Sequence, residues 1–476
     1  MPAPDGAGAP ACPTGTTSLW GLVGSPYPDP FDRIFKAYDV RGRVDEGELD
    51  EEIAERIGVG FARVTGASTV ALGRDCRPSS ASLAAAFLEG VRSQGCDATD
   101  LGLVPTEVVY YYSGLHGVPG AVVTASHNPA GYNGLKFCHR GAAPIGSGSG
   151  LERIRDVARS WTGDTLGEAR GRITRHDALP GYLEHVFRIV DPGGVGALRV
   201  AVDGGNGMAG LVISRLFQRL PSSTLTGLYL EPDGSFPNHP ADPLNPENLT
   251  DLVGLVREQG ADVGVAFDGD ADRAVFVDEQ GVPLPGSTAT AIIAGWFLAR
   301  RPGARIVHNL ICSRSVAEAI RSAGGVPVRT RVGHSFIKAV MADEDAVFGG
   351  EHSGHYYFGD NYGADSATLA MLVLLTVLTE AGVPLSEVRR GYEPYAMSGE
   401  INSVVTDPAA AIRAVESAFV GASLDHLDGL TVDLGDSWFN VRPSNTEPLL
   451  RLNAEAPDSG SLGQLVDRVR RLIDSA

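Results

Sequence analysis

The chain alternates between short apolar runs and longer segments in which hydrophobic residues recur with a helical period. In its first part, residues 49–64 and 82–94 predict amphipathic helices, and residues 68–72 and 121–123 predict strands. Strands that alternate with helices are typical of an α/β unit. The pattern therefore predicts one such unit near the start of the chain.

The same alternation occurs twice more, once from about Leu179 and once from about Pro285. The later elements are, in order, strand 198–202, helix 211–220, strand 224–230, helix 289–299, strand 305–308 and helix 315–323. A chain of 476 residues is too long for one core of usual size. Three serial α/β units followed by a smaller terminal unit is the simplest division.

This division predicts five segments. A leader over residues 1–30, rich in Pro, Gly and Ala, lacks the basic start of a signal peptide, so we expect it to be disordered. The three α/β units then cover residues 31–178, 179–284 and 285–394, and the terminal unit covers residues 395–476.

Charge and cysteine content restrict the partners and the compartment. The formal net charge of −19 repels phosphate polymers and anionic membranes, so we expect no nucleic-acid partner and no membrane partner. The apolar run at residues 369–378 is too short to span a bilayer. The 5 cysteines show no metal-ligand spacing and are odd in number, which favours a reducing cytoplasm. A monomer and a small homo-oligomer both stay open.

Candidate chemistry is concentrated in two stretches far apart in the chain. In the first, Thr-Ala-Ser-His-Asn-Pro, Ser126 follows a strand; in the second, Asp268, Asp270 and Asp272 precede Arg273. Neighbouring carboxylates repel one another unless a cation lies among them, and an all-oxygen site favours Mg²⁺. Since Mg²⁺ often takes phosphate oxygens as well, the two stretches together predict a serine that carries a phosphoryl group beside Mg²⁺.

Other interpretations of these stretches exist. The acidic spacing resembles a calcium-binding EF-hand loop, with Glu279 at its twelfth position, but Arg273 replaces the required glycine and the flanks at 263–267 and 274–277 predict strands instead of helices. Ser126 alone would be an ordinary turn or helix-capping residue.

A glycine turn supports a rival function. Gly205, Gly207 and Gly210 match the GxGxxG pattern between a strand and a helix, and Glu231 ends the next strand, as in a dinucleotide-binding unit. An NAD-dependent oxidoreductase is therefore the alternative, although it leaves Ser126 and the three aspartates unexplained.

Two later motifs suit a sugar phosphate. If residues 350–355 are extended, Glu351, Ser353 and His355 share one side and can bind sugar hydroxyls; a plain polar connector is equally consistent. The second motif suits a phosphate dianion, although it is also a common turn composition. It begins with a guanidinium and continues with two hydroxyls and an amide, on Arg442, Ser444, Thr446 and Asn445.

Lysine is rare, and each one is a candidate. Lys36, Lys136 and Lys338 are the lysines of the chain. Lys136 follows Ser126 across a glycine-containing turn, and an amine with a lowered pKa can act as a general acid or base. Lys36 and Lys338 are also consistent with solvated surface lysines.

At these four motifs, from about Phe35 to Ala456, the chain resembles the α-D-phosphohexomutase family and, within it, the bacterial phosphomannomutase/phosphoglucomutase group. The resemblance implies three related α/β domains and a C-terminal α+β domain, similar to the TATA-binding protein, around a central cleft. Each domain would contribute one motif.

The resemblance also implies the roles of particular residues. The implied catalytic residues are Ser126, Lys136, Arg41 and His355, and the implied Mg²⁺ ligands are Ser126, Asp268, Asp270 and Asp272. The implied substrate contacts are Tyr38, Arg273, Gly333, His334, Glu351, Ser353, His355, Arg442, Ser444, Asn445 and Thr446. One departure is Ile311, where some dual-specificity relatives have a lysine that contacts substrate.

The implied reaction moves a phosphoryl group between two ends of one hexose phosphate through a phosphoserine and a hexose 1,6-bisphosphate. Asn445 replaces a glycine of many glucose-type relatives, which favours mannose and leaves glucose open. A phosphoglucomutase and a phosphoglucosamine mutase of the same family are the alternatives.

Overall fold

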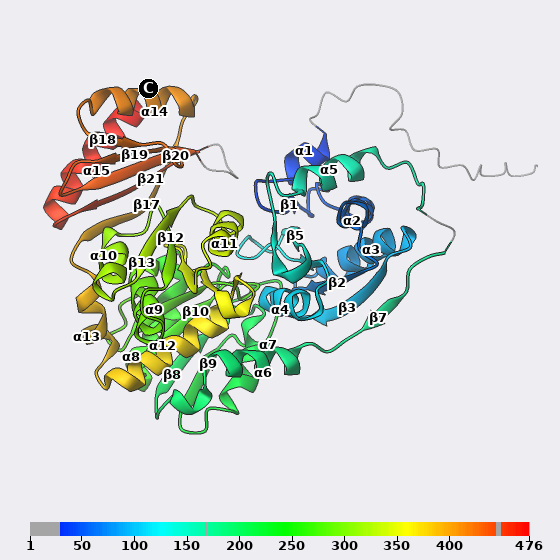
Figure 1. Cartoon of the computed structure of the whole chain (residues 1–476), viewed down its shortest axis with the longest axis horizontal. Helices are drawn as coiled ribbons and strands as arrows, with labels where there is room; N and C mark the ends of the chain where they lie inside the picture. Colours follow the sequence, from blue (N-terminus) through cyan, green and yellow to red (C-terminus); the bar gives the residue numbers. More distant parts are fainter. Residues whose placement is uncertain (1–28, 167–168, 444–448, 476) are drawn as a thin grey trace, which may run out of the picture.

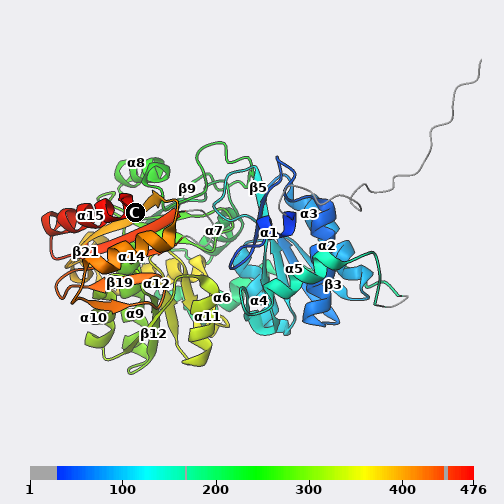
Figure 2. The same cartoon turned by 90° about the horizontal axis from the view of Figure 1, so that it is seen from above.

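The computed structural model describes residues 29–166, 169–443 and 449–475, which form four sheets in succession along the chain. In Figure 1 the first unit, blue to cyan, lies beside the second and third units, and the fourth, orange to red, lies over the third. Figure 2, turned by 90°, shows the first unit again to one side of the others. The prediction of α/β units followed by an α+β unit is confirmed.

The first unit has a mixed sheet in the order β1-β5-β4-β2-β3-β7, with β6 beside β5. Its strands are β1 (Val40–Arg43), β2 (Thr69–Arg74), β3 (Asp97–Leu103), β4 (Gly120–Val123), β5 (Tyr132–Cys138), β6 (Pro144–Ile145) and β7 (Ile173–Arg175). Its helices are α1 (Pro30–Ile34), α2 (Glu51–Thr65), α3 (Ser80–Ser93), α4 (Thr106–His116) and α5 (Leu151–Ser160). Helix α1 begins at Pro30, inside the segment that we expected to be a disordered leader.

The second unit has the sheet order β11-β10-β8-β9. Its strands are β8 (Arg199–Asp203), β9 (Thr224–Leu228), β10 (Val263–Phe267) and β11 (Ala274–Asp278), and its helices are α6 (Leu179–Ile189), α7 (Ala209–Phe217) and α8 (Thr250–Gln259). Strands β8, β9 and β10 are parallel, whereas β10 and β11 form an antiparallel hairpin around the aspartate loop.

The third unit has the sheet order β13-β12-β14-β15-β16. Its strands are β12 (Arg305–Asn309), β13 (Val326–Thr330), β14 (Phe348–Gly350), β15 (Tyr356–Phe358) and β16 (Ala364–Asp365). Its helices are α9 (Gly286–Arg300), α10 (Arg314–Ser322), α11 (His334–Asp343), α12 (Ala367–Ala381) and α13 (Leu385–Arg389).

The fourth unit is a wholly antiparallel sheet in the order β17-β21-β20-β19-β18. Its strands are β17 (Ala396–Val404), β18 (Ser423–Asp425), β19 (Leu430–Asp433), β20 (Trp438–Pro443) and β21 (Leu449–Ala456), and its helices are α14 (Pro408–Ala418) and α15 (Ser459–Asp474). Leu430, Phe439 and Val469 belong to a separate core under these two helices.

Helix α12 explains the longest apolar run of the sequence, because most of its side chains are buried in the protein core. Within the described residues no single helix is long and apolar enough to cross a membrane. Helix α12 and residues Leu385–Tyr392 together have the length and composition of a membrane-spanning segment, but the chain bends by 94° between them.

Candidate active site

Ser126 lies in the loop after β4, where the carboxyl ends of the parallel strands β2 and β4 meet. Its side chain is buried, and its backbone has a φ of 50°, a left-handed conformation that costs a non-glycine residue about 1–3 kcal/mol. The hydroxyl donates to Asp268 Oδ2 at 2.6 Å. The fold therefore brings the serine loop and the aspartate loop, distant in sequence, into direct contact.

The three aspartates lie on the turn between β10 and β11, as the flanking strands predicted, so the loop is not an EF-hand. One ligand atom from each of Asp268, Asp270 and Asp272 lies within 4.8 Å of the others, and all three side chains are buried. Asp270 Oδ1 and Asp272 Oδ1 have no hydrogen-bond partner among the described residues. Because buried carboxylate oxygens without a hydrogen bond are costly, this donor set fits a hard divalent cation.

The electrostatics of the cluster agree with that fit. Burial, and then repulsion from Asp272 and Asp270, raise the pKa of the Asp268 carboxyl. A cation among the three carboxylates would remove the repulsion and favour the charged form. The cluster therefore has the carboxylate composition of a metal site.

Lys136 projects from β5 into the same cluster. Its Nζ donates to Asp270 Oδ2 at 2.7 Å and to Asp272 Oδ2 at 2.5 Å. Burial favours a lower pKa, but attraction to these two carboxylates outweighs it and raises the pKa of Lys136. The expectation of a lowered amine pKa is therefore wrong, and Lys136 is an ammonium that partly neutralises the aspartates.

Two arginines and a histidine surround the cluster. Arg273 Nε lies 3.6 Å from Asp268 Oδ2 and 3.2 Å from His355 Nε2. His355 Nε2 lies 3.5 Å from Asp272 Oδ1. Arg41 donates to the Ala125 carbonyl, next to Ser126, and its Nε donates to an Asp39 carboxylate oxygen at 2.9 Å. Arg41, Arg273 and His355 therefore lie at the serine and aspartate loops.

The predicted sugar-binding loop is a tight turn, because the Glu351 N–H donates to the His355 carbonyl at 3.0 Å. The assumption of an extended segment is therefore wrong. The three side chains still converge, since His355 Nδ1 lies 3.3 Å from Glu351 Oε2 and 3.1 Å from Ser353 Oγ. Burial and Arg273 favour a lower pKa for His355, but its contacts with Asp272 and Glu351 prevail and raise that pKa to about 9.

Tyr38, Gly333 and His334 meet across the first and third units. The Tyr38 hydroxyl donates to the Val332 carbonyl at 3.0 Å, and its ring centroid lies 5.5 Å from that of His334. A Cβ on Gly333 would lie 2.6 Å from the Tyr38 ring, and its φ of 129° favours glycine. Both ring nitrogens of His334 are buried and have no hydrogen-bond partner among the described residues.

Of the four residues predicted to bind the phosphate dianion, the structure describes Arg442. The other three, Ser444, Asn445 and Thr446, lie outside the described residues. Its side chain is buried, and Nη2 lies 2.8 Å from Glu400 Oε2. Arg451 Nη1 lies 3.2 Å from the other oxygen of Glu400. Ile311, the position at which we noted a departure from the family resemblance, is buried.

The glycine turn that suggested a dinucleotide site is instead filled by backbone. A Cβ on Gly207 would lie 2.6 Å from the Gly269 carbonyl oxygen, and one on Gly210 would lie 1.7 Å from the Leu230 carbonyl oxygen. The Met208 N–H donates to the Gly269 carbonyl at 3.0 Å. The glycines allow close packing against the aspartate loop, which removes the observation that favoured an oxidoreductase.

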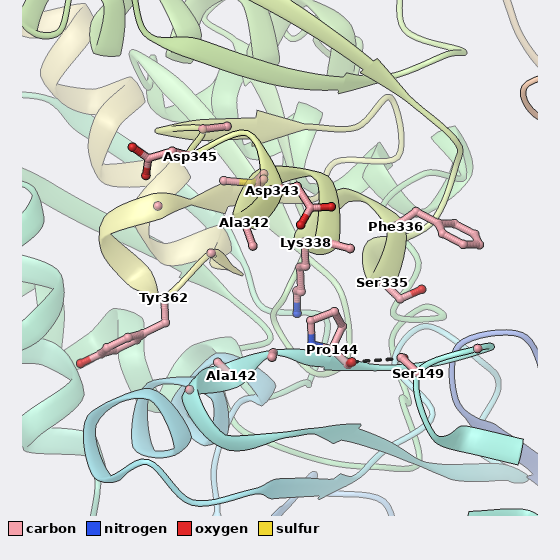
Figure 3. Close-up of a pocket in the computed structure, with 18 of the residues that line it drawn as sticks. Ala142, Pro144, Ser149, Ser335, Phe336, Lys338, Ala342, Asp343, Asp345 and Tyr362 are labelled. Atoms are coloured by element: carbon pink, nitrogen blue, oxygen red, sulfur yellow. Dashed lines mark hydrogen bonds between the residues drawn. The ribbon is translucent and has the colours of Figure 1, made fainter. Parts of the chain in front are cut away.

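Lys338 is not a surface lysine. Its Nζ lies 2.6 Å from Asp365 Oδ1 and 3.7 Å from the centroid of the Tyr110 ring. Figure 3 shows it in the wall of a cavity of about 630 Å³ between α11 and residues 141–149. The residues that line this cavity include none of the predicted catalytic residues.

The sequence interpretation missed Arg77 and Thr106. Thr106 Oγ1 donates to Asp270 Oδ2 at 2.5 Å, and Arg77 donates to the Ser126 carbonyl at 2.8 Å. Thr106 begins the helix after β3, and Arg77 follows β2. Since β2, β3 and β4 are parallel, their carboxyl ends share one edge of the sheet, and this rule could have identified both residues.

Comparison with known proteins gives the class. Family models described as phosphoglucomutase/phosphomannomutase match residues 32–162 as α/β/α domain I, 180–281 as domain II, 285–395 as domain III and 400–472 as the C-terminal domain. The chain is 40% identical over 432 residues to phosphohexose mutases of Xanthomonas campestris, covering 90% of this chain and 96% of the relative. It is 37% identical over 448 residues to the phosphomannomutase of Escherichia coli K12, covering 92% and 98%.

Solved structures agree. A phosphoglucomutase/phosphomannomutase family protein from Burkholderia thailandensis has a TM-score of 0.82 at 33% identity, with coverage of 93% of this chain and 97% of that chain. The fold is also that of the Aspergillus fumigatus N-acetylphosphoglucosamine mutase, solved in complex with GlcNAc-6P and magnesium, with a TM-score of 0.58 at 16% identity and coverage of 94% and 96%.

Fold, site and relatives together define an enzyme that moves a phosphoryl group within one molecule. The chain belongs to the phosphoglucomutase/phosphomannomutase family of α-D-phosphohexomutases. It is therefore a phosphohexomutase, an isomerase of the intramolecular phosphotransferase class, whose relatives use a metal ion.

Proposed function

We propose that this phosphohexomutase interconverts mannose 6-phosphate and mannose 1-phosphate through phosphorylated Ser126 and a hexose 1,6-bisphosphate. The observation that carries the proposal is the contact of 2.6 Å between Ser126 Oγ and Asp268 Oδ2, beside two buried aspartate oxygens that have no hydrogen-bond partner among the described residues. Asn445 and the relatives named phosphomannomutase support mannose. Action on glucose phosphates is the second candidate, because the family description includes phosphoglucomutase.

We propose Mg²⁺ as the metal, held by Asp268, Asp270, Asp272 and Ser126, where it would neutralise charge on the transferred phosphoryl group. The bond between Ser126 Oγ and phosphorus breaks while a sugar hydroxyl oxygen bonds to phosphorus. The freed Ser126 oxygen takes up a proton, for which Lys136 is the proposed donor, and the proton that the sugar hydroxyl loses returns to Lys136. In the second half the bisphosphate returns its other phosphoryl group to Ser126.

Residues from the other units would hold the sugar phosphate. Arg442, with Ser444, Asn445 and Thr446, is proposed to bind the phosphate dianion that is not reacting. Further proposed substrate contacts are Tyr38, Arg273, Gly333, His334, Glu351, Ser353 and His355. Their placement at one junction of the first, second and third units supports this assignment.

A coupled assay tests the proposal. Purified protein is treated with a chelator, restored with Mg²⁺, and compared on mannose 1-phosphate, glucose 1-phosphate and glucosamine 1-phosphate. We expect turnover after Mg²⁺ is restored and the highest kcat/KM on mannose 1-phosphate. Preference for glucosamine 1-phosphate would contradict the sugar assignment, and full turnover in the chelator would contradict the metal assignment. A cytoplasmic location and a monomeric or small homo-oligomeric state stay predictions from the sequence.

A further inference from the structure

Arg77 is buried directly beneath the serine loop. Its side chain is 0% exposed, and its guanidinium makes five hydrogen bonds. Nε donates to Asp75 Oδ2 at 3.1 Å. The other four bonds go to the carbonyl oxygens of Ser126 (2.8 Å), Asn128 (2.6 Å), Pro129 (2.7 Å) and Tyr132 (3.0 Å).

This set of acceptors requires a planar, forked cation. A guanidinium presents five N–H donors in fixed directions, whereas a lysine has three donors on one atom and cannot reach all four carbonyl oxygens together. Asp75 holds the fork in place, because its Oδ1 also accepts from the Arg77 N–H at 3.0 Å and from Ser80 Oγ at 2.5 Å.

The hydrogen bonds from Arg77 to the serine loop, here called the Arg77 clamp, restrict the direction of the Ser126 side chain. Ser126 has a left-handed backbone, so its carbonyl oxygen faces Arg77 while its hydroxyl faces Asp268. Fixing the carbonyl oxygen fixes the peptide plane after Ser126 and restricts the direction of its Cα–Cβ bond, while the bond to Asp268 orients Oγ. Without the Arg77 clamp, the left-handed backbone of Ser126 would relax toward a more common conformation.

The second unit closes over the same arginine. The Phe236 ring centroid lies 5.0 Å from Arg77 Cζ, and a Cβ on Gly234 would lie 2.3 Å from Arg77 Cα. A Cβ on Gly269, in the aspartate loop, would lie 2.4 Å from the Ser126 carbonyl oxygen. Arg77 therefore supports the serine loop where it meets the aspartate loop.

We propose that Arg77 is a positioning residue for phosphoryl transfer, which holds Ser126 Oγ at the metal site without touching substrate. This inference rests on the proposed role of Ser126. Because a misplacement of 1 Å can cost about 100-fold in rate, Arg77→Lys should lower kcat by about 100-fold. The KM for hexose phosphate should change by less than about threefold, since the residues that bind the sugar are untouched.

Arg56→Lys is the matched control. Arg56 also donates to three backbone carbonyl oxygens, those of Ala158 (3.0 Å), Arg159 (2.8 Å) and Trp161 (3.2 Å), in the same unit. That segment contains no predicted site residue, so Arg56→Lys should lower the Tm but keep kcat. Arg77→Ala adds a readout that a general loss of stability does not give. Free guanidinium at millimolar concentration should restore part of the kcat of Arg77→Ala and should leave the kcat of Arg56→Ala unchanged.

Three outcomes separate the possibilities. A kcat loss in Arg77→Lys, with KM preserved and guanidinium rescue of Arg77→Ala, supports the inference. Wild-type kcat in folded Arg77→Lys, or an Arg77→Ala protein that guanidinium does not rescue, overturns it while the proposed function stands. A wild-type protein without mutase turnover overturns the proposed function and this inference with it.

Discussion

The carboxylate of a single residue, Glu351, already has three hydrogen-bond donors of the protein around it. Its buried carboxylate accepts from Tyr357 OH at 2.7 Å, from Asn309 Nδ2 at 3.1 Å and from the Gly333 N–H at 3.2 Å. Burial opposes ionisation, but His355, and then the hydrogen bonds from Tyr357 and Asn309, lower the pKa of Glu351 to about 2. A sugar hydroxyl must therefore share an acceptor that is already paired.

We predict that Glu351→Ala leaves Ser126 able to carry a phosphoryl group but lowers kcat/KM for every hexose phosphate by about 100-fold or more, since lost charge-assisted bonds are worth about 1.5–3 kcal/mol each. Phosphoserine content and kinetics measure the two effects. Tyr357→Phe removes one hydrogen bond to Glu351 and is the control; we expect a lower Tm with nearly unchanged kcat/KM. Wild-type kinetics in Glu351→Ala would make the loop a plain connector.

Among the helices and strands, local sequence signals were sufficient to predict a helix where residues at its own ends stabilise it. Asp50 caps α2 through the Ile53 N–H at 2.9 Å, and Gly66 ends it with a φ of 57°. The turn at Gly205 to Gly210 carried a misleading signal, because its partner, the aspartate loop, is distant in sequence. Patterns of local composition do not show which backbone fills a glycine turn.

We predict that Gly207→Ala lowers mutase activity, because a Cβ there lies 2.6 Å from the Gly269 carbonyl oxygen and displaces the aspartate loop. The Mg²⁺ concentration for half-maximal rate should rise, which a Mg²⁺ titration of kcat measures. Gly254→Ala, on α8 at a position where an added Cβ would meet no atom within 4 Å apart from its chain neighbours and its own helix's backbone, is the control and should raise stability by about 1 kcal/mol with unchanged activity. Normal Mg²⁺ dependence in Gly207→Ala would contradict this role.

At the scale of the whole molecule, the first three units share one hydrophobic core that includes Ala71, Val202 and Leu374. The hydrophobic pattern predicted serial α/β units but not this shared core, because apolar periodicity shows which face is buried and not which unit covers it. Arg77 and Thr106 were missed because apolar periodicity does not show polar contacts with segments distant in sequence, which are Ser126 for Arg77 and Asp270 for Thr106.

Glu107 joins two of these units. Its carboxylate on α4 accepts from the Thr368 hydroxyl of α12, and its other oxygen has no hydrogen-bond partner among the described residues. Burial raises the pKa of Glu107 to about 7, although hydrogen bonds from Ser366 and Thr368 oppose the rise. A carboxyl whose folded-state pKa is raised stabilises the fold below the unfolded pKa of about 4.3, and this contribution is lost as pH rises through about 7.

We predict that Glu107→Gln raises the Tm at pH 8, where wild type must hold a buried charge, and changes it little at pH 5. The free-energy difference is on the order of 3 kcal/mol. Thermal unfolding at the two pH values measures it, and Glu258→Gln, an exposed change on α8, should show no such difference. A Glu107→Gln protein that is equally destabilised at both values would show that the carboxyl is not the cause.

The mass of the intact protein after incubation with a hexose 1,6-bisphosphate and Mg²⁺ tests most directly whether Ser126 carries the phosphoryl group. We expect one added phosphoryl group per chain, mapped to Ser126, which is lost when mannose 6-phosphate is added and bisphosphate forms. Ser126→Ala should remain unmodified and lose activity by several orders of magnitude with its fold intact. Turnover without a phosphorylated Ser126, or near-normal turnover in Ser126→Ala, would contradict this role of Ser126.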